Sequence, residues 1–123
     1  MRFDLQAFWG SKWYYAEYST FTVRPESSNY RLHVSGFSGN VGLENGKSAF
    51  EWHNGLMFTT MDRDNDPLSW NCAVEKGSGF WYSRCGWCDV NSVRRRYSGQ
   101  FFWSGLYKGK SDLRSSRMWL KCK

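Results

Sequence analysis

Three carboxylates crowded into a short run are the densest chemistry in this chain. Asp62, Asp64 and Asp66 alternate with other residues, and a cysteine follows at position 72. Alternating acids on a flexible segment can direct several hard oxygens at one cation, and Ca²⁺ takes about 6 to 8 oxygen ligands. The run therefore predicts a calcium loop, with a solvated acidic turn as the alternative. The EF-hand template does not apply, because Pro67 and Ala73 stand where it needs glycine and glutamate.

The four cysteines allow two disulfides, a zinc site or a redox pair. They are Cys72, Cys85, Cys88 and Cys122. Cys85 and Cys88 have the C-x-x-C spacing of thioredoxin-like enzymes, but no βαβ pattern surrounds them. A structural zinc site would need a second closely spaced ligand pair, which the sequence lacks. Disulfides in an oxidising compartment are therefore the expectation.

Neither histidine belongs to a catalytic pattern. His33 and His53 have no serine or cysteine nucleophile in a recognisable arrangement with them, and no glycine-rich phosphate loop is present. We expect His33 to face solvent on a strand and His53 to be a hydrogen-bonded turn residue. The chain is predicted to bind a partner and not to be an enzyme.

Composition indicates one β-rich domain. Among 123 residues, aromatics make up 20%, with 12 glycines and 2 prolines, a balance that favours strands and turns over long helices. No apolar run reaches the roughly 18 residues of a membrane span. Arg2 and Asp4 interrupt any apolar leader, so we expect a removed targeting sequence or a piece of a longer protein.

Positive charge is concentrated near the C-terminus. Residues 1–93 carry 8 basic and 10 acidic side chains, whereas residues 94–123 carry 9 basic and 1 acidic. A basic face there would attract an anionic polymer such as a sulfated glycan, or an acidic protein. The alternative is an ordinary solvated face, and no motif supports specific binding of nucleic acid. The basic residues are Arg94, Arg95, Arg96, Lys108, Lys110, Arg114, Arg117, Lys121 and Lys123.

Alternation of apolar and polar residues predicts the strands. It occurs at residues 3–7, continues in β-branched and aromatic residues over 13–23 after a Gly-Ser turn, and returns at residues 30–34. The first two strands should form a hairpin. Periodicity fades over 36–79, where we expect ordered loops with short helical turns, fixed by trapped aromatics and bound metal. A last strand is predicted over 116–121, with Met118 and Leu120 on one face.

Five runs in order and spacing resemble the fibrinogen C-terminal domain of ficolins, tachylectins, tenascins, angiopoietins and the fibrinogen chains. They begin at Tyr30, His53, Asp62, Asn71 and Gly79. The resemblance implies an α+β, β-rich fold: an antiparallel twisted sheet, short helices and a large loop-rich calcium-binding subdomain. Residues 1–35 would supply sheet strands, and residues 36–123 the calcium and pocket region and the C-terminal strand. Since the family domain opens with an N-terminal subdomain, the chain would be its C-terminal portion, with a sheet edge that another segment or chain covers.

The resemblance also implies a calcium site and a disulfide. Carboxylates of Asp64 and Asp66 and backbone carbonyls of Leu68 and Trp70 would hold Ca²⁺, with Asp62 outside the coordination sphere. Cys72 would pair with Cys85, after a cis peptide between Arg84 and Cys85. Cys88 and Cys122 lie outside the family pattern, and we expect them to pair with each other.

A ligand pocket is expected beside that disulfide, and its composition decides between two functions. The family pattern maps it onto Lys76, Arg84, Cys85, Gly86, Tyr97 and Ser98. The first hypothesis is a secreted, calcium-dependent lectin-like module that binds glycans or acetylated groups, as in innate immunity. However, acetyl-binding members have histidine and an aromatic residue where Gly86 and Lys76 stand here. The alternative is therefore a module of angiopoietin or tenascin type that binds a receptor or matrix protein, as in cell adhesion, through this face and the basic C-terminal patch. Oligomers would form through segments outside the chain.

Overall fold

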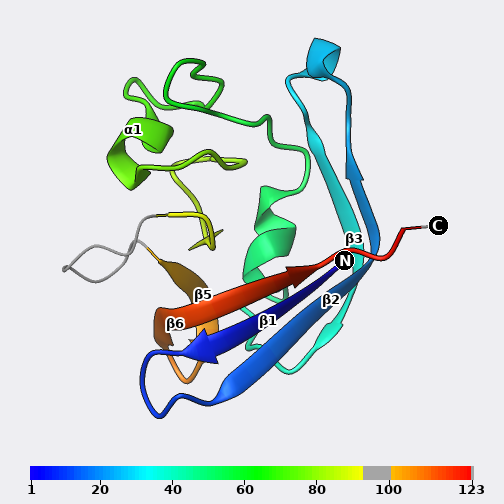
Figure 1. The fold of residues 1–123 in the computed structure, drawn as a ribbon, viewed down its shortest axis with the longest axis vertical. Coiled ribbons are helices and arrows are strands. Elements are labelled where there is room, and N and C mark those ends of the chain that lie inside the picture. Colours follow the sequence, from blue (N-terminus) through cyan, green and yellow to red (C-terminus); the bar gives the residue numbers. More distant parts are fainter. Residues whose placement is uncertain (93–100, 123) are drawn as a thin grey trace.

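A computed structural model describes residues 1–92 and 101–122, and their strands form one six-stranded antiparallel sheet in the order β3-β2-β1-β6-β5-β4 (Figure 1). No helix in these two ranges is long and apolar enough to cross a membrane. The elements are β1 Arg2–Ala7, β2 Trp13–Val23, the 3₁₀ helix η1 Glu26–Ser28, β3 Leu32–Gly39, the 3₁₀ helix η2 Ala49–His53, α1 Cys72–Lys76, β4 Cys88–Asp89, β5 Phe102–Tyr107 and β6 Lys110–Trp119.

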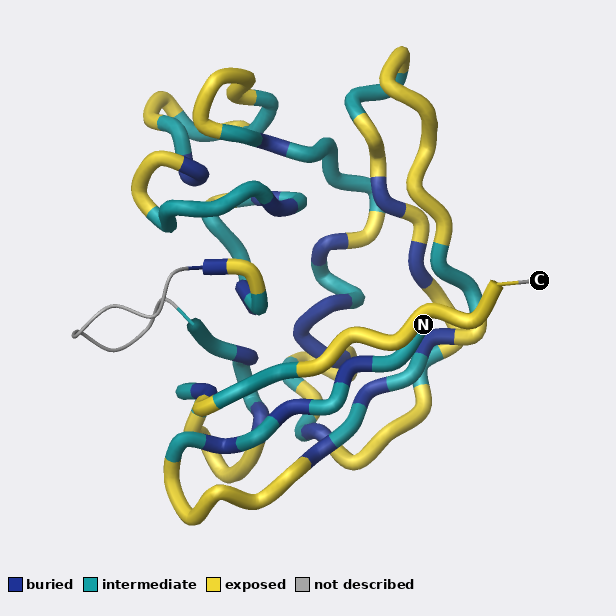
Figure 2. Tube along the Cα trace, in the orientation of Figure 1, coloured by how far each residue is buried: buried dark blue, intermediate teal, exposed yellow. Residues whose placement is uncertain are grey.

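The hairpin predicted at the N-terminus is confirmed. Strands β1 and β2 pair antiparallel, with Leu5 opposite Tyr14. The apolar side chains of β1 point to one face, so half-buried and buried residues alternate along the strand (Figure 2). The third predicted strand, expected over 30–34, is β3; it begins at Leu32, continues to Gly39 and pairs antiparallel with β2.

The C-terminal part of the sheet differs from the prediction. Strand β6 starts at Lys110 and ends at Trp119, so the predicted strand over 116–121 was too short and placed too late. Met118 and Leu120 are both exposed. Strand β6 pairs with β1 and β5, and neither β5 nor the short β4 was predicted. The reason is that Leu113 is the one fully buried residue of β6, which leaves no alternation to detect.

Aromatic side chains build the core against one face of the sheet. Phe50 of η2 lies 4.9 Å from Phe3 and 5.5 Å from Tyr18 between ring centroids. A capping box stabilises the N-terminus of η2, in which the Ser48 N–H donates to Glu51 Oε2 at 2.7 Å. These contacts seat η2 against the sheet (Figure 1).

Loops were expected over residues 36–79; residues 36–39 instead continue β3, and residues 40–79 contain no strand of the sheet and only the short helices η2 and α1. Trp81 contacts Phe50 at 6.1 Å and Phe58 at 5.1 Å, and an isolated bridge joins Thr59 to Phe80. Trapped aromatics therefore hold this region to the core, as predicted. The bound metal that was also predicted for this region would lie in the acidic loop.

The opposite face of the sheet is exposed and carries paired charges and rings. Arg2 Nε lies 2.8 Å from Asp4 Oδ1, and Trp119 Nε1 donates to Asp4 Oδ2 at 2.6 Å. Arg117 stacks over the Trp13 ring at 4.9 Å. Such contacts at a wet surface contribute little to stability, but they cover apolar rings that solvent would otherwise meet.

Candidate calcium loop and recognition surface

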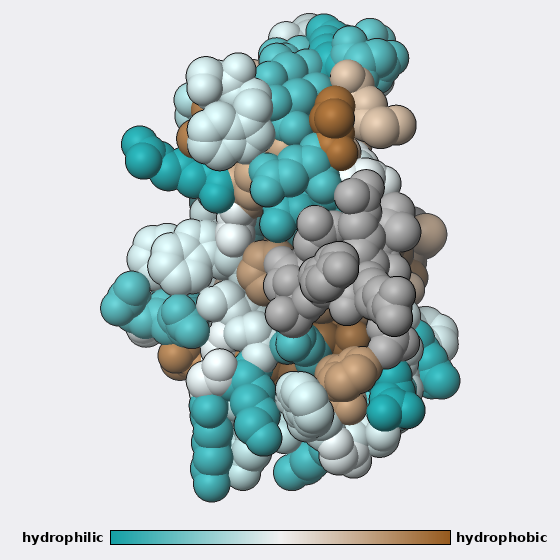
Figure 3. Space-filling model, turned by 90° about the vertical axis from the view of Figure 1, so that its left-hand side faces the viewer, coloured by the Kyte–Doolittle hydropathy of each residue, from teal (hydrophilic) through white to brown (hydrophobic). Residues whose placement is uncertain are grey.

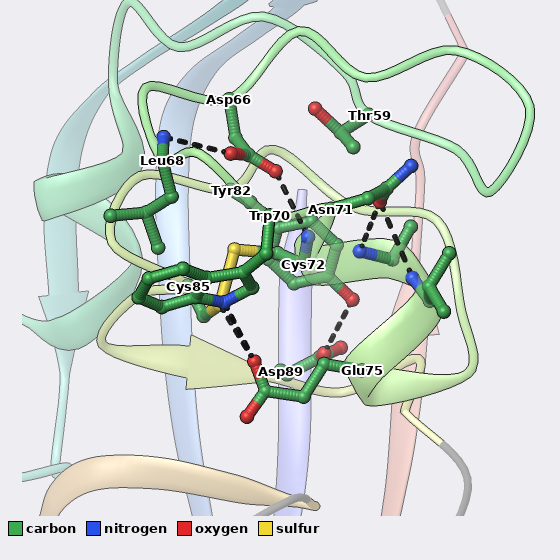
Figure 4. The surroundings of a disulfide bond; sticks show 12 residues. Thr59, Asp66, Leu68, Trp70, Asn71, Cys72, Glu75, Tyr82, Cys85 and Asp89 are labelled. Atoms are coloured by element: carbon green, nitrogen blue, oxygen red, sulfur yellow. Dashed lines mark hydrogen bonds between the residues drawn. A yellow bond between two sulfur atoms is a disulfide. The ribbon is translucent and has the colours of Figure 1, made fainter.

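The acidic loop is folded by its own side chains. Asp64 Oδ1 accepts a hydrogen bond from the backbone N–H of Asp66 at 3.1 Å. Asp66 accepts from the N–H groups of Leu68 and Cys72, both at 3.0 Å (Figure 4). Asp62 instead accepts from the Thr60 hydroxyl at 2.7 Å. Asp66 therefore joins the loop to the start of α1.

The donor set suits a hard cation. Burial raises the pKa of the Asp66 carboxyl, backbone hydrogen bonds lower it, and the adjacent Asp64 carboxyl raises it again. Two acids side by side repel each other unless a cation lies between them. Within the described ranges, no donor occupies the backbone carbonyls of Leu68 and Trp70. No group of three His, Cys, Asp or Glu side chains suited to a metal occurs there, so a site would depend on two acids and two carbonyls.

A disulfide joins Cys72 of α1 to Cys85, with their Cα atoms 5.4 Å apart (Figure 4). The expected Cys88–Cys122 bond is wrong. Cys88 is a free, buried thiol in β4, and Cys122 is a free, exposed thiol beyond β6. Burial also raises the pKa of the Cys88 thiol well above its ordinary value, which leaves it protonated and inert.

Helix α1 is short and capped from outside. The Asn71 side-chain oxygen accepts from the N–H groups of Ala73 and Val74 at 2.8 and 3.3 Å. Its amide nitrogen donates to the carbonyls of Thr60 and Met61 at 3.0 and 3.2 Å. One side chain thus supplies the helix cap and fixes the segment before the acidic loop.

His53 organises the segment after the disulfide. Its Nδ1 lies 2.7 Å from the Trp81 carbonyl, and its Nε2 accepts from the N–H groups of Trp87 and Cys88 at 3.0 and 3.3 Å. This pattern requires the neutral ring with hydrogen on Nδ1. Burial agrees with it, lowering the pKa of His53 to about 4. The expected hydrogen-bonded position of His53 is confirmed, and His33 is exposed on β3 as predicted.

Gly86 is needed because the His53 ring lies against it. Its φ is +131°, and a β-carbon there would collide with His53 Cε1. The neighbouring Cys85 has φ +51°, and every peptide bond in the described ranges is trans. The cis peptide expected between Arg84 and Cys85 is therefore absent, and left-handed backbone at the two residues makes the turn instead.

A buried acid beside the disulfide was not predicted. Asp89 accepts from the Tyr82 hydroxyl at 2.8 Å and from the Asn91 N–H at 3.0 Å. Burial raises the pKa of Asp89, while these hydrogen bonds lower it. An acid within an aromatic, cysteine-rich stretch was the one available signal. Through these two hydrogen bonds, Asp89 connects the segment around Tyr82 to the segment around Asn91.

The predicted ligand pocket is brought together only in part. Arg84 is exposed, Cys85 is half-buried, and Gly86 is closed off by His53. Lys76 lies over the Phe102 ring, with its Nζ 5.7 Å from the ring centroid. Tyr97 and Ser98 lie outside the described residues. Two clefts lined by described residues lie elsewhere, on the sheet.

Exposed apolar side chains surround α1 instead. Met61, Trp70 and Val74 are 65%, 54% and 57% exposed. Trp70 Nε1 donates to Glu75 Oε2 at 3.0 Å, which fixes the indole beside the disulfide (Figure 4). We call Met61, Trp70 and Val74 the α1 surface. One exposed indole, one thioether and one aliphatic side chain on or next to the same short helix are typical of a contact surface.

Comparison with known families matches residues 1–122 to the C-terminal globular domain of fibrinogen beta and gamma chains. The chain belongs to this family. Among relatives, human angiopoietin-related protein 6 is 33% identical over 92% of the chain, and bovine angiopoietin-related protein 1 is 38% identical over 92%. The chain spans about a quarter of the length of these curated relatives, 24% and 23% respectively.

Solved structures show the same fibrinogen-like fold. The fibrinogen-like globe domain of human ANGPTL2 has a TM-score of 0.76 at 32% identity, covering 94% of this chain and 54% of that one. A lamprey fibrin D-dimer complexed with the peptide ligand Gly-His-Arg-Pro-amide has a TM-score of 0.72 at 27% identity, covering 94% and 42%. The fibrinogen C-terminal family is one of non-enzymatic binding domains. Cys85 is bonded to Cys72 and not to Cys88, so the two cysteines of the C-x-x-C spacing do not form a redox pair with each other.

Proposed function

We propose that this chain is part of an extracellular recognition module that binds a protein, either a receptor or a matrix component. The observation that carries the proposal is the α1 surface. Tryptophan and methionine are enriched at protein interfaces, and exposed tryptophan often supplies much of the binding free energy. Trp70 is also held in place by Glu75, so little side-chain entropy is lost on binding.

Calcium would act on the same surface. In this proposal, Asp64, Asp66 and the carbonyls of Leu68 and Trp70 hold one Ca²⁺. Trp70 then contributes its carbonyl to the ion and its indole to the α1 surface. Ion binding would hold the backbone that carries the already fixed indole, which makes recognition depend on calcium without contact between ion and partner.

In this proposal protein binding comes before glycan binding, the reverse of their order in the sequence analysis. An acetylated sugar needs a walled pocket, and here Gly86 is packed against His53 while Lys76 covers Phe102. The relatives also favour a protein partner, since the similar lamprey fibrin structure contains a peptide ligand. Glycan recognition becomes the competing outcome of the test.

An extracellular site of action is part of the proposal. The Cys72–Cys85 disulfide supports it, because such bonds persist in oxidising compartments.

Cell binding tests the proposal with treatments that separate proteins from sugars. Fluorescent chain is applied in calcium to cells before and after trypsin, and before and after enzymatic removal of N-linked and sialylated glycans. We expect trypsin-sensitive binding that Trp70→Ala and Val74→Ser weaken about ten-fold. Leu43→Ser, which removes an equally exposed apolar side chain elsewhere, should leave binding unchanged. Binding that survives trypsin and is released by free N-acetylglucosamine would refute a protein partner.

A further inference from the structure

Two hairpin turns enclose a cleft at one end of the sheet. The β1–β2 turn and the β5–β6 turn lie side by side there (Figure 1). The cleft between them has a volume of about 390 Å³. We call it the two-turn cleft. Its lining residues are Ala7, Trp9, Gly10, Lys12, Tyr14, Leu106, Tyr107, Lys110 and Asp112.

Aromatic rings form the floor and rim of the cleft. Tyr14, buried, and Tyr107, half exposed, lie 5.7 Å apart with an interplanar angle of 30°. Trp9 is 57% exposed at the rim. Flat exposed rings next to a cavity give a sugar ring or another planar group a surface to stack on.

Lysines surround these rings. Lys12 Nζ lies 5.4 Å from the Tyr14 centroid, Lys108 Nζ 5.2 Å from the Tyr107 centroid, and Lys110 Nζ 5.9 Å from the Trp9 centroid. None of the three takes part in an ion pair within residues 1–92 and 101–122. Asp112 is the one acid among the described lining residues. The cleft therefore carries net positive charge. Figure 3 views the molecule from the side on which the turns lie, and its lower end shows hydrophilic side chains beside paler ones.

The backbone fixes these groups. The Ala7 N–H donates to the Lys12 carbonyl at 2.8 Å, and the Phe8 N–H to the Asp112 carbonyl at 3.0 Å, which joins the two turns. The β5–β6 turn consists of Lys108 and Gly109 at φ +44° and +77°. A two-residue turn with both φ positive prefers Asn or Gly at its first position. Lys108 is therefore an uncommon residue at this position of the turn.

We propose that the two-turn cleft binds a sulfated polysaccharide. Uncompensated lysines supply the counter-charge for sulfate, and Trp9 and Tyr107 supply stacking surfaces for the sugar rings. The disulfide indicates an oxidising compartment, where sulfated polysaccharides are more abundant than nucleic acids. This site lies at the other end of the molecule from α1 (Figure 1) and does not depend on the protein-binding proposal.

Calorimetry with a heparin-derived hexasaccharide tests the assignment. We expect binding that weakens with added salt and persists in EDTA, because no calcium is involved. Lys12→Gln with Lys110→Gln should weaken it about ten-fold, since two charges near the ligand are removed. The matched control, Arg24→Gln with Lys121→Gln, removes the same charge away from the cleft and should change affinity less than two-fold. Trp9→Ala should also weaken binding at unchanged net charge.

Three results would overturn the assignment. Equal losses in the two double variants would show attraction to the net charge of the chain and not to the cleft. Equal binding of fully desulfated hexasaccharide would remove sulfate as the recognised group. Equal or tighter binding of a single-stranded oligonucleotide of the same charge would assign the cleft to nucleic acid.

Discussion

At the scale of single residues, His53 and Gly86 shape the region after the disulfide more than the acids do. The histidine ties three backbone groups from residues 81–88 with one ring. That ring then occupies the space in which a side chain at position 86 would lie. Gly86 stands where acetyl-binding members have a histidine side chain in the pocket wall. The packing of the His53 ring against this position requires glycine.

His53 should make stability depend on pH. Its pKa falls from 6.5 to about 4 on folding, so the unfolded chain binds a proton more readily. Stability from this group is therefore fully present above pH 6.5 and falls by about 3 kcal/mol as pH drops towards 4. The free energy of unfolding, measured by urea denaturation at several pH values, should fall less steeply with decreasing pH in His53→Gln than in the wild type. Equal slopes would contradict the buried, neutral ring, and His33→Gln is the matched control.

Gly86→Ala should destabilise the fold through its clash with the His53 ring. We expect a loss of about 2 to 4 kcal/mol, the sum of left-handed backbone strain and overpacking. Gly46→Ala is the matched control, since Gly46 also has positive φ (+81°) but no atom within 4 Å of an added β-carbon. It should lose only about 1 kcal/mol in the same denaturation series. Similar losses at both positions would refute the packing argument.

At the scale of elements, the sequence pattern predicted the strands that have one buried face and one face turned to solvent. Strands β1, β2 and β3 alternate clearly and were predicted. Strand β6 was misplaced and β5 missed, since polar residues of β6 such as Lys110 and Ser111 are sheet members through backbone pairing alone. The acidic run could be located from the sequence itself, whereas the Cys72–Cys85 pairing came only from the resemblance to the fibrinogen C-terminal domain. The state of Cys88 could not, because it depends on burial against Trp103 across the sheet.

Asn71 should couple α1 to the acidic loop. Asn71→Ala removes the helix cap and the donation to the carbonyls of Thr60 and Met61, and should cost about 1 to 2 kcal/mol in thermal or urea unfolding. Asn71→Asp keeps the cap acceptor and loses only the donation, so it should cost less. A larger loss for Asp than for Ala would contradict the capping role.

At the scale of the whole molecule, two exposed surfaces lie at opposite ends of the molecule (Figure 1). The α1 surface belongs to the disulfide-linked loop region, whereas the two-turn cleft belongs to the strand ends (Figure 1). A protein partner and a polyanion could thus be held together without competing. Such paired binding raises overall affinity through effective concentration.

Thiol reactivity should report the fold of the whole chain. One disulfide, one buried thiol and one exposed thiol are present. Ellman's reagent should therefore detect one thiol per chain in the native protein and two after denaturation without reductant. Cys122→Ser should remove the native signal. Absence of any thiol after denaturation would establish a second disulfide and contradict the buried Cys88.

Calcium titration by calorimetry tests the central claim, that an ion at the acidic loop stabilises the recognition surface. We predict one Ca²⁺ per chain with a dissociation constant of roughly 10⁻⁴ to 10⁻³ M, as in extracellular modules, and a melting temperature that rises with calcium. Asp64→Asn with Asp66→Asn should abolish both effects, while Asp62→Asn should keep them. Unchanged calcium affinity in the double variant would contradict the account.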